Sequence, residues 1–315
     1  MDSIFQQRLI KIEQSLDEAL KASFSPEWKK DSFGILPAAA DEKYIRELIA
    51  PCRNLVDLGG KRWRPLLLVL CAESAKETKT GTPLTDSQIY SLAPLVEFAH
   101  TASLIHDDIE DCADMRRGKP AAHITCGIDT ALNAASWLYF EAPVCIQKLP
   151  VSDSTKLLLN NVFLNQLRRL HLGQAMDISW HRTPDIFPSK EEYFAMTKCK
   201  TGTLAALAAE TGILAGGGTP EQALKAAETA AEIGIGFQIL DDVQNLTTGN
   251  PGKKRGDDIV EGKKSLPVLL SCDASPANKK KLASLFTQAR KEGINSPAVE
   301  ECISLLEKNG AIEKA

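Results

Sequence analysis

The chain of 315 residues has few of the features that stabilise small or metal-dependent proteins. Its eight cysteines are scattered singly, and no two have CxxC spacing. It has only five histidines, and none lies in an HExxH motif. The sequence therefore gives no support to a structural zinc site or a disulfide-stapled miniprotein. Single cysteines of this kind are typical of reduced, buried thiols, which predicts a cytoplasmic protein.

Long apolar runs are also missing. The run that begins at Leu66 ends after a few residues, whereas a membrane span needs about 20. The opening segment MDSIFQQRLIKIEQ has no apolar signal core. Lys and Arg number 37 and Asp and Glu number 41, so the net charge is −4, which argues against nucleic acid as a partner. We expect a globular protein without a transmembrane segment.

Helical periodicity dominates what is present. Apolar residues recur every three or four positions, and no series of alternating strands or fixed-period repeat occurs. The expected helices cover residues 4–20, 41–58, 85–111, 125–149, 153–180, 203–214 and 219–246, and the segment from 278 onward. The predicted fold is all-α, with residues 1–315 forming a single domain. Two separate helical bundles are the alternative that the sequence leaves open.

Two acidic motifs are the strongest chemical signal, and each ends a long apolar helix. The first motif spans residues 107–111, and its carboxylates at Asp107 and Asp111 share one helical face. Like charges at that spacing destabilise a helix unless a cation binds between them. Oxygen-only ligands suit Mg²⁺, which often bridges to phosphate. The second motif spans residues 241–245 and is expected to have the same geometry, although Asn245 replaces its last acid.

Lysines and arginines gather beside glycines along the chain. They occur in Gly59-Gly60-Lys61-Arg62-Trp63-Arg64-Pro65, in Arg116-Arg117, at Lys198 and Lys200, in Lys253-Lys254-Arg255 and in Lys263-Lys264. Each alone would be a solvated face, but together with metal-binding acids they describe a site for phosphate-rich anions. The loop around Gly252 has the wrong spacing for a P-loop, and no strand precedes it. A P-loop NTPase is therefore rejected.

The sequence resembles the trans-isoprenyl diphosphate synthases of the polyprenyl synthetase family. The resemblance covers roughly residues 40–270 and rests on six motifs in order: GGKRWRP, HTASLIHDDIEDCADMRRGKP, GQAMD, KTGTL, GFQILDD and GKKRGDDIVEGKKSLP. It implies an isoprenoid synthase fold, a helical bundle around a central apolar cavity, and a homodimer. The implied activity is head-to-tail condensation of isopentenyl diphosphate with an allylic diphosphate, with Mg²⁺ as cofactor.

The resemblance also assigns roles by position. Isopentenyl diphosphate would be bound by Lys61, Arg64 and His100, with Arg117 beside them. The allylic diphosphate would be bound by Arg116, Lys200 and Lys254, and Thr201 would be a further substrate-binding residue. Gln174 and Asp177 match the GQxxD motif near the metals, and Gln238 and Lys263 match further substrate contacts. The metal ligands would be Asp107, Asp111 and Asp241, and the catalytic set would be Asp107, Asp108, Asp111, Lys200, Asp241 and Lys254.

This chemistry needs no side-chain nucleophile. Ionising the C–O bond of an allylic diphosphate requires Mg²⁺ and Lys or Arg to stabilise the leaving pyrophosphate, and an apolar cavity to exclude water. The side chains one turn before Asp107 are Ala102 and Ser103, which are small. They predict a product longer than C15, with C20 to C25 favoured, unless Trp137, Tyr139 or Phe140 closes the cavity.

Asn245 leaves other functions open. The lost charge predicts weaker or altered Mg²⁺ binding, and a catalytically impaired regulatory partner subunit is one alternative. A longer-chain polyprenyl synthase is another. A class I terpene cyclase or a head-to-head condensing enzyme would not need Lys61, Arg64 and His100, so both fit this sequence less well.

Overall fold

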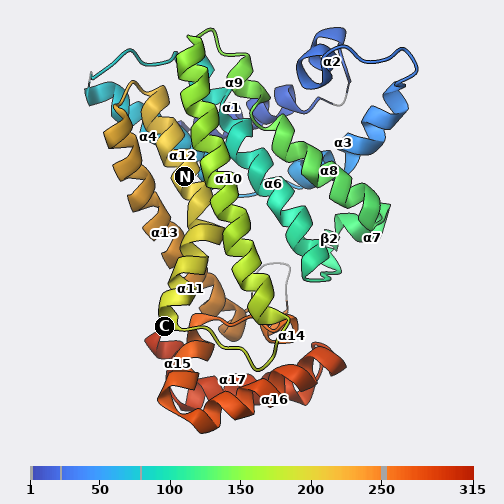
Figure 1. The fold of residues 1–315 in the computed structure, drawn as a ribbon, viewed down its shortest axis with the longest axis vertical. Coiled ribbons are helices and arrows are strands. Elements are labelled where there is room, and N and C mark those ends of the chain that lie inside the picture. Colours follow the sequence, from blue (N-terminus) through green and yellow to red (C-terminus); the bar gives the residue numbers. More distant parts are fainter. Residues whose placement is uncertain (1–2, 22, 79, 250–253) are drawn as a thin grey trace. The chain divides into compact units, whose positions relative to one another are not determined.

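The computed structural model describes residues 3–21, 23–78, 80–249 and 254–315. Most of these residues are helical and very few lie in strands, which confirms the all-α prediction (Figure 1). The chain divides into two compact units, the first of residues 1–167 and 204–230 and the second of residues 168–203 and 231–315. No helix of the described residues is both long enough and apolar enough to cross a bilayer.

The first unit contains the N-terminal helices and a short hairpin. Its elements are α1 (Ser3–Ala19), α2 (Pro26–Phe33), α3 (Glu42–Asp57), α4 (Trp63–Thr78), α5 (Asp86–Tyr90), α6 (Ala93–Glu110), β1 (Met115–Arg116), β2 (Lys119–Pro120), α7 (Ala122–Cys126), α8 (Ile128–Glu141) and α9 (Val144–Gln147). Helices α10 (Asp153–His181), α12 (Thr203–Ala215) and α13 (Pro220–Thr247) contribute residues to both units.

Helix α6 is the centre of the first unit. It contacts α1, α3, α4, α7, α8 and α9, and Figure 1 shows it beside α8. Ala93, Leu95, Val96 and Phe98 point in several directions around the helix, yet none is exposed. A helix that is apolar on every side is stable only inside a core. This burial fixes the residues at the carboxyl end of α6, where the first acidic motif lies.

Local signals explain where the predicted helices end. Thr85 caps α5 in a capping box with Gln88, as the sequence indicated. The predicted helix over 85–111 is divided into α5 and α6, because Pro94 in the first turn of α6 has no N–H for an uninterrupted helix. The predicted helix over 125–149 is likewise divided, at Gly127, with φ of 87°, and at Pro143.

The second unit contains the C-terminal helices. Its further elements are α11 (Lys190–Thr197), the π-helical turn η1 (Lys198–Gly202), α14 (Asp257–Glu261), α15 (Leu266–Ala274), α16 (Pro276–Glu292), α17 (Pro297–Lys308) and α18 (Ala311–Lys314). Helices α16 and α17 pack together around Phe286, Ile303 and Leu306, which are buried. A second apolar cluster joins Trp180, Tyr193 and Leu266. Burial of these side chains holds α11 and α15 beside the end of α10.

Candidate active site

The first acidic motif occupies the carboxyl end of α6. Asp107 lies in its last turn and Asp111 is its C-cap, where the negative end of the helix dipole disfavours further negative charge. Arg116 partly offsets this, because its Nε donates to Asp108 Oδ1 at 2.8 Å and its Nη2 lies 3.7 Å from Asp107 Oδ2. Burial raises the pKa of Asp108, although Arg116 opposes the rise. Asp108 is therefore an internal anchor for Arg116, whereas Asp107 and Asp111 are partly exposed.

The oxygen atoms at this helix end fit Mg²⁺ in type and number. Two partly exposed carboxylates stand one helical turn apart at the negative end of a helix, which is a favourable place for a cation. Within the described ranges, no group of three or more Asp, Glu, His or Cys side chains could enclose a metal ion. Mg²⁺ often binds through one or two carboxylates and completes its shell with water and substrate phosphate. Asp107 and Asp111 therefore suit an ion shared with a phosphate-bearing substrate.

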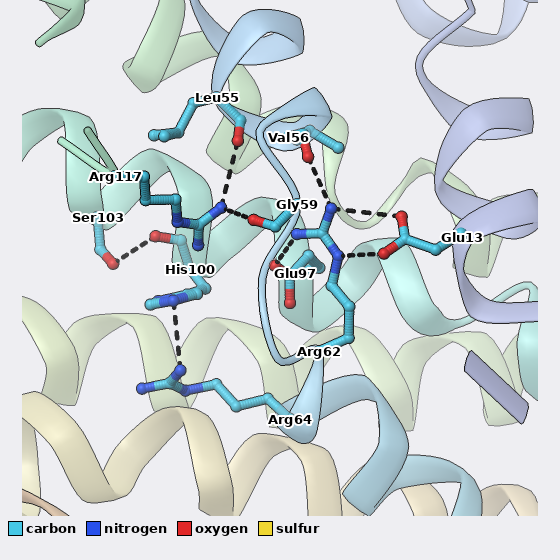
Figure 2. Close-up of polar contacts among 10 residues, drawn as sticks. All are labelled: Glu13, Leu55, Val56, Gly59, Arg62, Arg64, Glu97, His100, Ser103 and Arg117. Carbon is cyan, nitrogen blue, oxygen red and sulfur yellow. Dashed lines mark hydrogen bonds and ion pairs between the residues drawn. The ribbon is translucent and has the colours of Figure 1, made fainter. Parts of the chain in front are cut away.

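A cluster of basic residues is grouped around His100, which lies about two turns before Asp107 on α6. Figure 2 shows Arg64, from α4, directed at His100 of α6, with 3.3 Å between Arg64 Nη1 and His100 Nε2. Arginine can only donate, so His100 Nε2 is the acceptor. Arg117 Nη1 donates to the carbonyl oxygens of Leu55 and Gly59, which fixes it against the loop before α4. Three predicted ligands of one substrate, at positions 64, 100 and 117, are thus brought together.

The charge of this cluster is poorly balanced by the protein itself. Burial, followed by the charges of Arg64 and Arg117, lowers the pKa of His100 well below its usual value, so His100 is neutral at physiological pH. Burial also lowers the pKa of Arg64 to about 10, against the opposing charge of Glu97. Buried cations are costly unless an anion compensates them. The cluster is therefore suited to a polyanionic ligand.

In the second unit, Lys200 is held against the GQxxD motif. Its Nζ donates to Asp177 Oδ2 at 2.5 Å, and the Asp177 side chain is buried. The approach requires Gly173, because a Cβ there would lie 2.3 Å from the backbone nitrogen of Lys200. Lys200 belongs to the π-helical turn η1, a wider turn that often occurs at functional sites. The sequence predicted Lys200 as a site residue but gave no sign of the π turn.

A hydrogen-bond network centres on the second acidic motif. Thr201 Oγ1 donates to Gln238 Oε1 at 2.8 Å, and Gln238 Nε2 donates to Asp242 Oδ1 at 2.9 Å. Asp242 Oδ2 accepts from the Tyr193 hydroxyl at 2.7 Å and from the backbone N–H of Leu266 at 3.1 Å. Asp242 is therefore buried and structural. Its neighbour Asp241 is exposed, as its predicted role as metal ligand requires.

The remaining predicted residues are less closely grouped. Gln174 is half-buried on α10, one turn before Asp177, and Lys263 pairs with Glu261 Oε2 at 2.9 Å. Lys61 is exposed in the loop before α4. Lys254 is exposed before α14, and in the described part of the chain its side chain makes no hydrogen bond to another predicted site residue. Lys253, in the same predicted cationic run, lies outside the described residues.

The polyprenyl synthetase family profile matches residues 45–305, most of the chain. The chain belongs to the polyprenyl synthetase family. It is 37% identical over 237 residues to a geranylgeranyl diphosphate synthase of Methanosarcina mazei, covering 75% of this chain and 69% of that enzyme. It is 32% identical to a short chain isoprenyl diphosphate synthase of Methanothermobacter thermautotrophicus, covering 85% and 79% of the two chains. The family, and with it the prediction of a prenyltransferase, is confirmed.

A solved structure agrees with this assignment. The fold is similar to that of a geranylgeranyl pyrophosphate synthetase from Pyrococcus horikoshii Ot3, with a TM-score of 0.78 and 28% identity. The match covers 98% of this chain and 85% of the other. The isoprenoid synthase fold predicted from the six motifs is therefore confirmed.

The helical spacing expected at the second motif is present, because Asp241 and Asn245 lie four residues apart within α13. Asn245 is nevertheless not accessible beside Asp241 in the way that Asp111 is partly exposed beside Asp107. Instead Asn245 is fully buried, and neither atom of its side-chain amide has a hydrogen-bond partner among the described residues. The reason is that residues 242, 245 and 246 form the inner face of α13, and the backbone N–H of Gly256 donates to the Asn245 carbonyl. Of the two aspartates in this motif, Asp241 is exposed and Asp242 is buried.

The residues predicted to set product length all lie in the first unit. Ala102 is fully buried, and Ser103 Oγ donates to the carbonyl of His100 in its own helix. Of the three aromatic candidates for a cavity floor, Trp137 stacks on Phe33 with ring centroids 5.9 Å apart. Tyr139 stacks on His106, also in the first unit. Phe140 is 79% exposed, so it does not close a cavity inside this chain.

Sequence reasoning missed residues that support the site rather than form it. Arg62 was counted as one of three cations, yet it is buried in ion pairs with Glu13 and Glu97. Glu97 could have been noticed as a lone acid in the apolar segment APLVEFAHTA, where only a buried partner would stabilise it. Tyr193 gave no comparable signal, because its partner Asp242 is 49 residues away.

Proposed function

We propose that this polyprenyl synthetase condenses isopentenyl diphosphate head-to-tail with an allylic diphosphate, using Mg²⁺, to give an all-trans product of C20 to C25. The observation that carries the proposal is the cluster of Arg64, His100 and Arg117, a half-buried site rich in positive charge near the first acidic motif. Partly desolvated positive charge favours an anionic ligand, and a diphosphate carries negative charge that would compensate it.

The proposed roles follow from how each group is held. Arg64 and neutral His100 bind and orient isopentenyl diphosphate, with Lys61 exposed nearby in sequence. Asp107 and Asp111 in the first unit, and Asp241 in the second, would serve as ligands for Mg²⁺, which when bound would supply positive charge to stabilise the departing pyrophosphate. Lys200 is oriented by Asp177 and contacts the allylic diphosphate. The allylic C–O bond breaks, the double bond of isopentenyl diphosphate forms the new C–C bond, and a proton is lost.

The product length is proposed from two facts. Ala102 puts no bulk on the buried face of α6, and relatives that match this chain include a geranylgeranyl diphosphate synthase. A C20 product agrees with both. A longer-chain synthase is the second candidate, because Phe140 is exposed and so would not close the cavity of this chain against a longer product. The regulatory-subunit alternative depends on Asn245, and burial of that side chain gives it no support.

Assembly and location are part of the proposal. Exposed apolar side chains follow one another on α7 and α8, namely Ile124, Ile128, Leu132 and Phe140. We propose that a second copy of the chain covers them in a homodimer, which sedimentation equilibrium would test. We also propose that residues 1–315 act as one catalytic domain, because the family match runs through both units. The eight unpaired cysteines suit a reducing, cytoplasmic setting.

The test supplies Mg²⁺, isopentenyl diphosphate and C5, C10 or C15 allylic primers to the purified protein. A prenyl diphosphate synthase consumes both substrates and releases pyrophosphate. A terpene cyclase would consume the allylic substrate alone, and a head-to-head enzyme would join two allylic molecules. No turnover of a folded protein with any primer would overturn the proposal and favour a partner subunit.

A further inference from the structure

Arg62 has an unusual backbone for a side chain of its size. Its φ is 45°, in the left-handed region that disfavours residues other than glycine. Such a conformation costs on the order of 1–3 kcal/mol and persists only where the surroundings impose it. Arg62 lies between Lys61 and Trp63, at the junction of the glycine loop and α4. The strain is therefore located in the segment that carries two predicted diphosphate ligands.

The guanidinium of Arg62 is tied in three directions, as Figure 2 shows. Its Nη1 donates to Glu97 Oε1 at 2.6 Å, its Nε donates to Glu13 Oε1 at 2.8 Å, and its Nη2 donates to the Val56 carbonyl at 2.7 Å. Arg62 is 4% exposed and Glu97 is 3% exposed. Burial works against the charge of Arg62, yet the pairing with Glu13 and Glu97 raises its pKa. These bonds depend on the planar, forked guanidinium of arginine, a geometry that lysine lacks.

These bonds connect Arg62 to three helices, α1 through Glu13, α3 through Val56 and α6 through Glu97. Glu97 lies one turn before His100 on α6, so the bond fixes the loop relative to the residue that Arg64 contacts.

Arg117 holds the same loop from another direction. Its guanidinium donates to the Gly59 carbonyl, and a Cβ on Gly60 would lie 3.3 Å from Arg117 Nη2. The loop is therefore fixed by two arginines, of which only Arg117 was expected to face substrate. Each of the three guanidinium nitrogens of Arg62 donates to a partner within the protein, and the residue is 4% exposed.

We propose that Arg62 is a positioning residue for isopentenyl diphosphate, holding the loop of residues 59–62 so that Lys61 and Arg64 meet the diphosphate together with His100. The inference rests on the proposed function, because it assigns these residues to that substrate. Glu97 is its main partner, since the pair is buried. Glu13 contributes less, because its side chain is 47% exposed and solvent weakens the pair.

The experiment compares Arg62→Met with Arg62→Gly in the full-length protein. Methionine removes the hydrogen bonds but keeps the backbone strain, whereas glycine removes the bonds and relieves the strain. We expect both variants to raise the KM for isopentenyl diphosphate about tenfold or more, with the KM for the allylic substrate nearly unchanged. Glu13→Gln should change the first KM only about twofold.

The matched control is Glu73→Gln. It breaks the Arg8–Glu73 pair, with 2.7 Å between Arg8 Nη2 and Glu73 Oε2, which also ties α1 to its neighbours but does not touch the loop. Glu73→Gln should keep native KM values. If Arg62→Met fails to fold, Arg62→Lys replaces it, since lysine keeps the charge while losing the fork.

Three outcomes would overturn the inference. One is a native KM for isopentenyl diphosphate in Arg62→Met, and another is a native KM in Arg62→Gly, which would show that backbone conformation alone sets the loop. The third is an equal rise in both KM values, which would indicate a general structural role. Absence of turnover in the native protein would instead overturn the proposed function, so the two failures are distinguishable.

Discussion

A methyl group added at Gly173 of α10 should push this helix away from η1, the turn that carries Lys200. A Cβ at this residue would lie 2.3 Å from Lys200 N and 2.7 Å from the Cys199 carbonyl carbon. Both are backbone atoms and cannot rotate away. Ordinary contact begins near 3.4 Å, so α10 and η1 must move apart by about 1 Å. We therefore expect Gly173→Ala to lower the free energy of unfolding by roughly 1–3 kcal/mol.

The same movement should disturb the chemistry. Lys200 Nζ and Asp177 Oδ2 are 2.5 Å apart, and a shift of about 1 Å would take them beyond hydrogen-bond distance. A misplacement of that size can cost about 10²-fold in rate. Gly173→Ala should accordingly reduce kcat/KM for the allylic substrate by about that factor, measured with isopentenyl diphosphate saturating.

Two glycine variants control for the separate effects. In Gly212→Ala the new Cβ would meet the Leu68 carbonyl oxygen at 2.3 Å, an equal clash away from Lys200. It should destabilise the protein similarly and leave the allylic kinetics nearly native. Gly236→Ala meets nothing within 4 Å and should stabilise α13 by about 0.5–1 kcal/mol. The reasoning is refuted if Gly173→Ala keeps native kinetics, or if Gly212→Ala loses activity to the same extent.

Three further predictions concern other positions. Asn245→Leu should raise the unfolding free energy, because an apolar group replaces a buried amide that has no hydrogen-bond partner among the described residues. The Mg²⁺ concentration for half-maximal activity should not change, and a higher Mg²⁺ requirement would show that Asn245 serves the metal. Burial raises the pKa of Glu141 from 4.5 to about 7, so the folded state binds this proton more tightly than the unfolded state does. The free energy of unfolding should therefore fall by on the order of 3 kcal/mol as the pH rises from 4.5 to 7. Urea unfolding should show that Glu141→Gln lacks this part of the pH slope, and an identical slope would contradict the assignment. Ala102→Phe should shorten the product, as chromatography of the hydrolysed prenyl alcohols would reveal, and an unchanged chain length would place Ala102 away from the growing chain.

Much of the fold could be predicted because its signals are local. The capping box at Thr85 and the proline at the start of α13 are determined by neighbouring residues, and α13 runs over Pro220–Thr247 close to the expected bounds. The division between α5 and α6 was also visible in principle at Pro94, but the strong apolar periodicity on both sides suggested one helix. Periodicity predicts which face is buried and is a weaker guide to where a helix is interrupted.

The sequence motifs predict which residues form the candidate site, but they do not predict the contacts that hold those residues in place. The roles of Arg64 and His100 came from motifs, whereas the buried pair of Arg62 and Glu97 depends on residues 35 apart in the chain. The failure at Asn245 has the same cause, because spacing within a helix predicts which residues share a face but not which face another segment covers. The Arg62–Glu97 pair and the burial of Asn245 both depend on packing between segments that are distant in the sequence.

The central claim is tested most directly by incubating the protein with Mg²⁺, isopentenyl diphosphate and a C15 allylic diphosphate, then measuring product mass by mass spectrometry. The account predicts a prenyl diphosphate of C20 to C25, released together with pyrophosphate and lost when Mg²⁺ is removed by a chelator. A folded protein that leaves the C15 primer unextended, or that stops at C15 when given C5 or C10 primers, would contradict it.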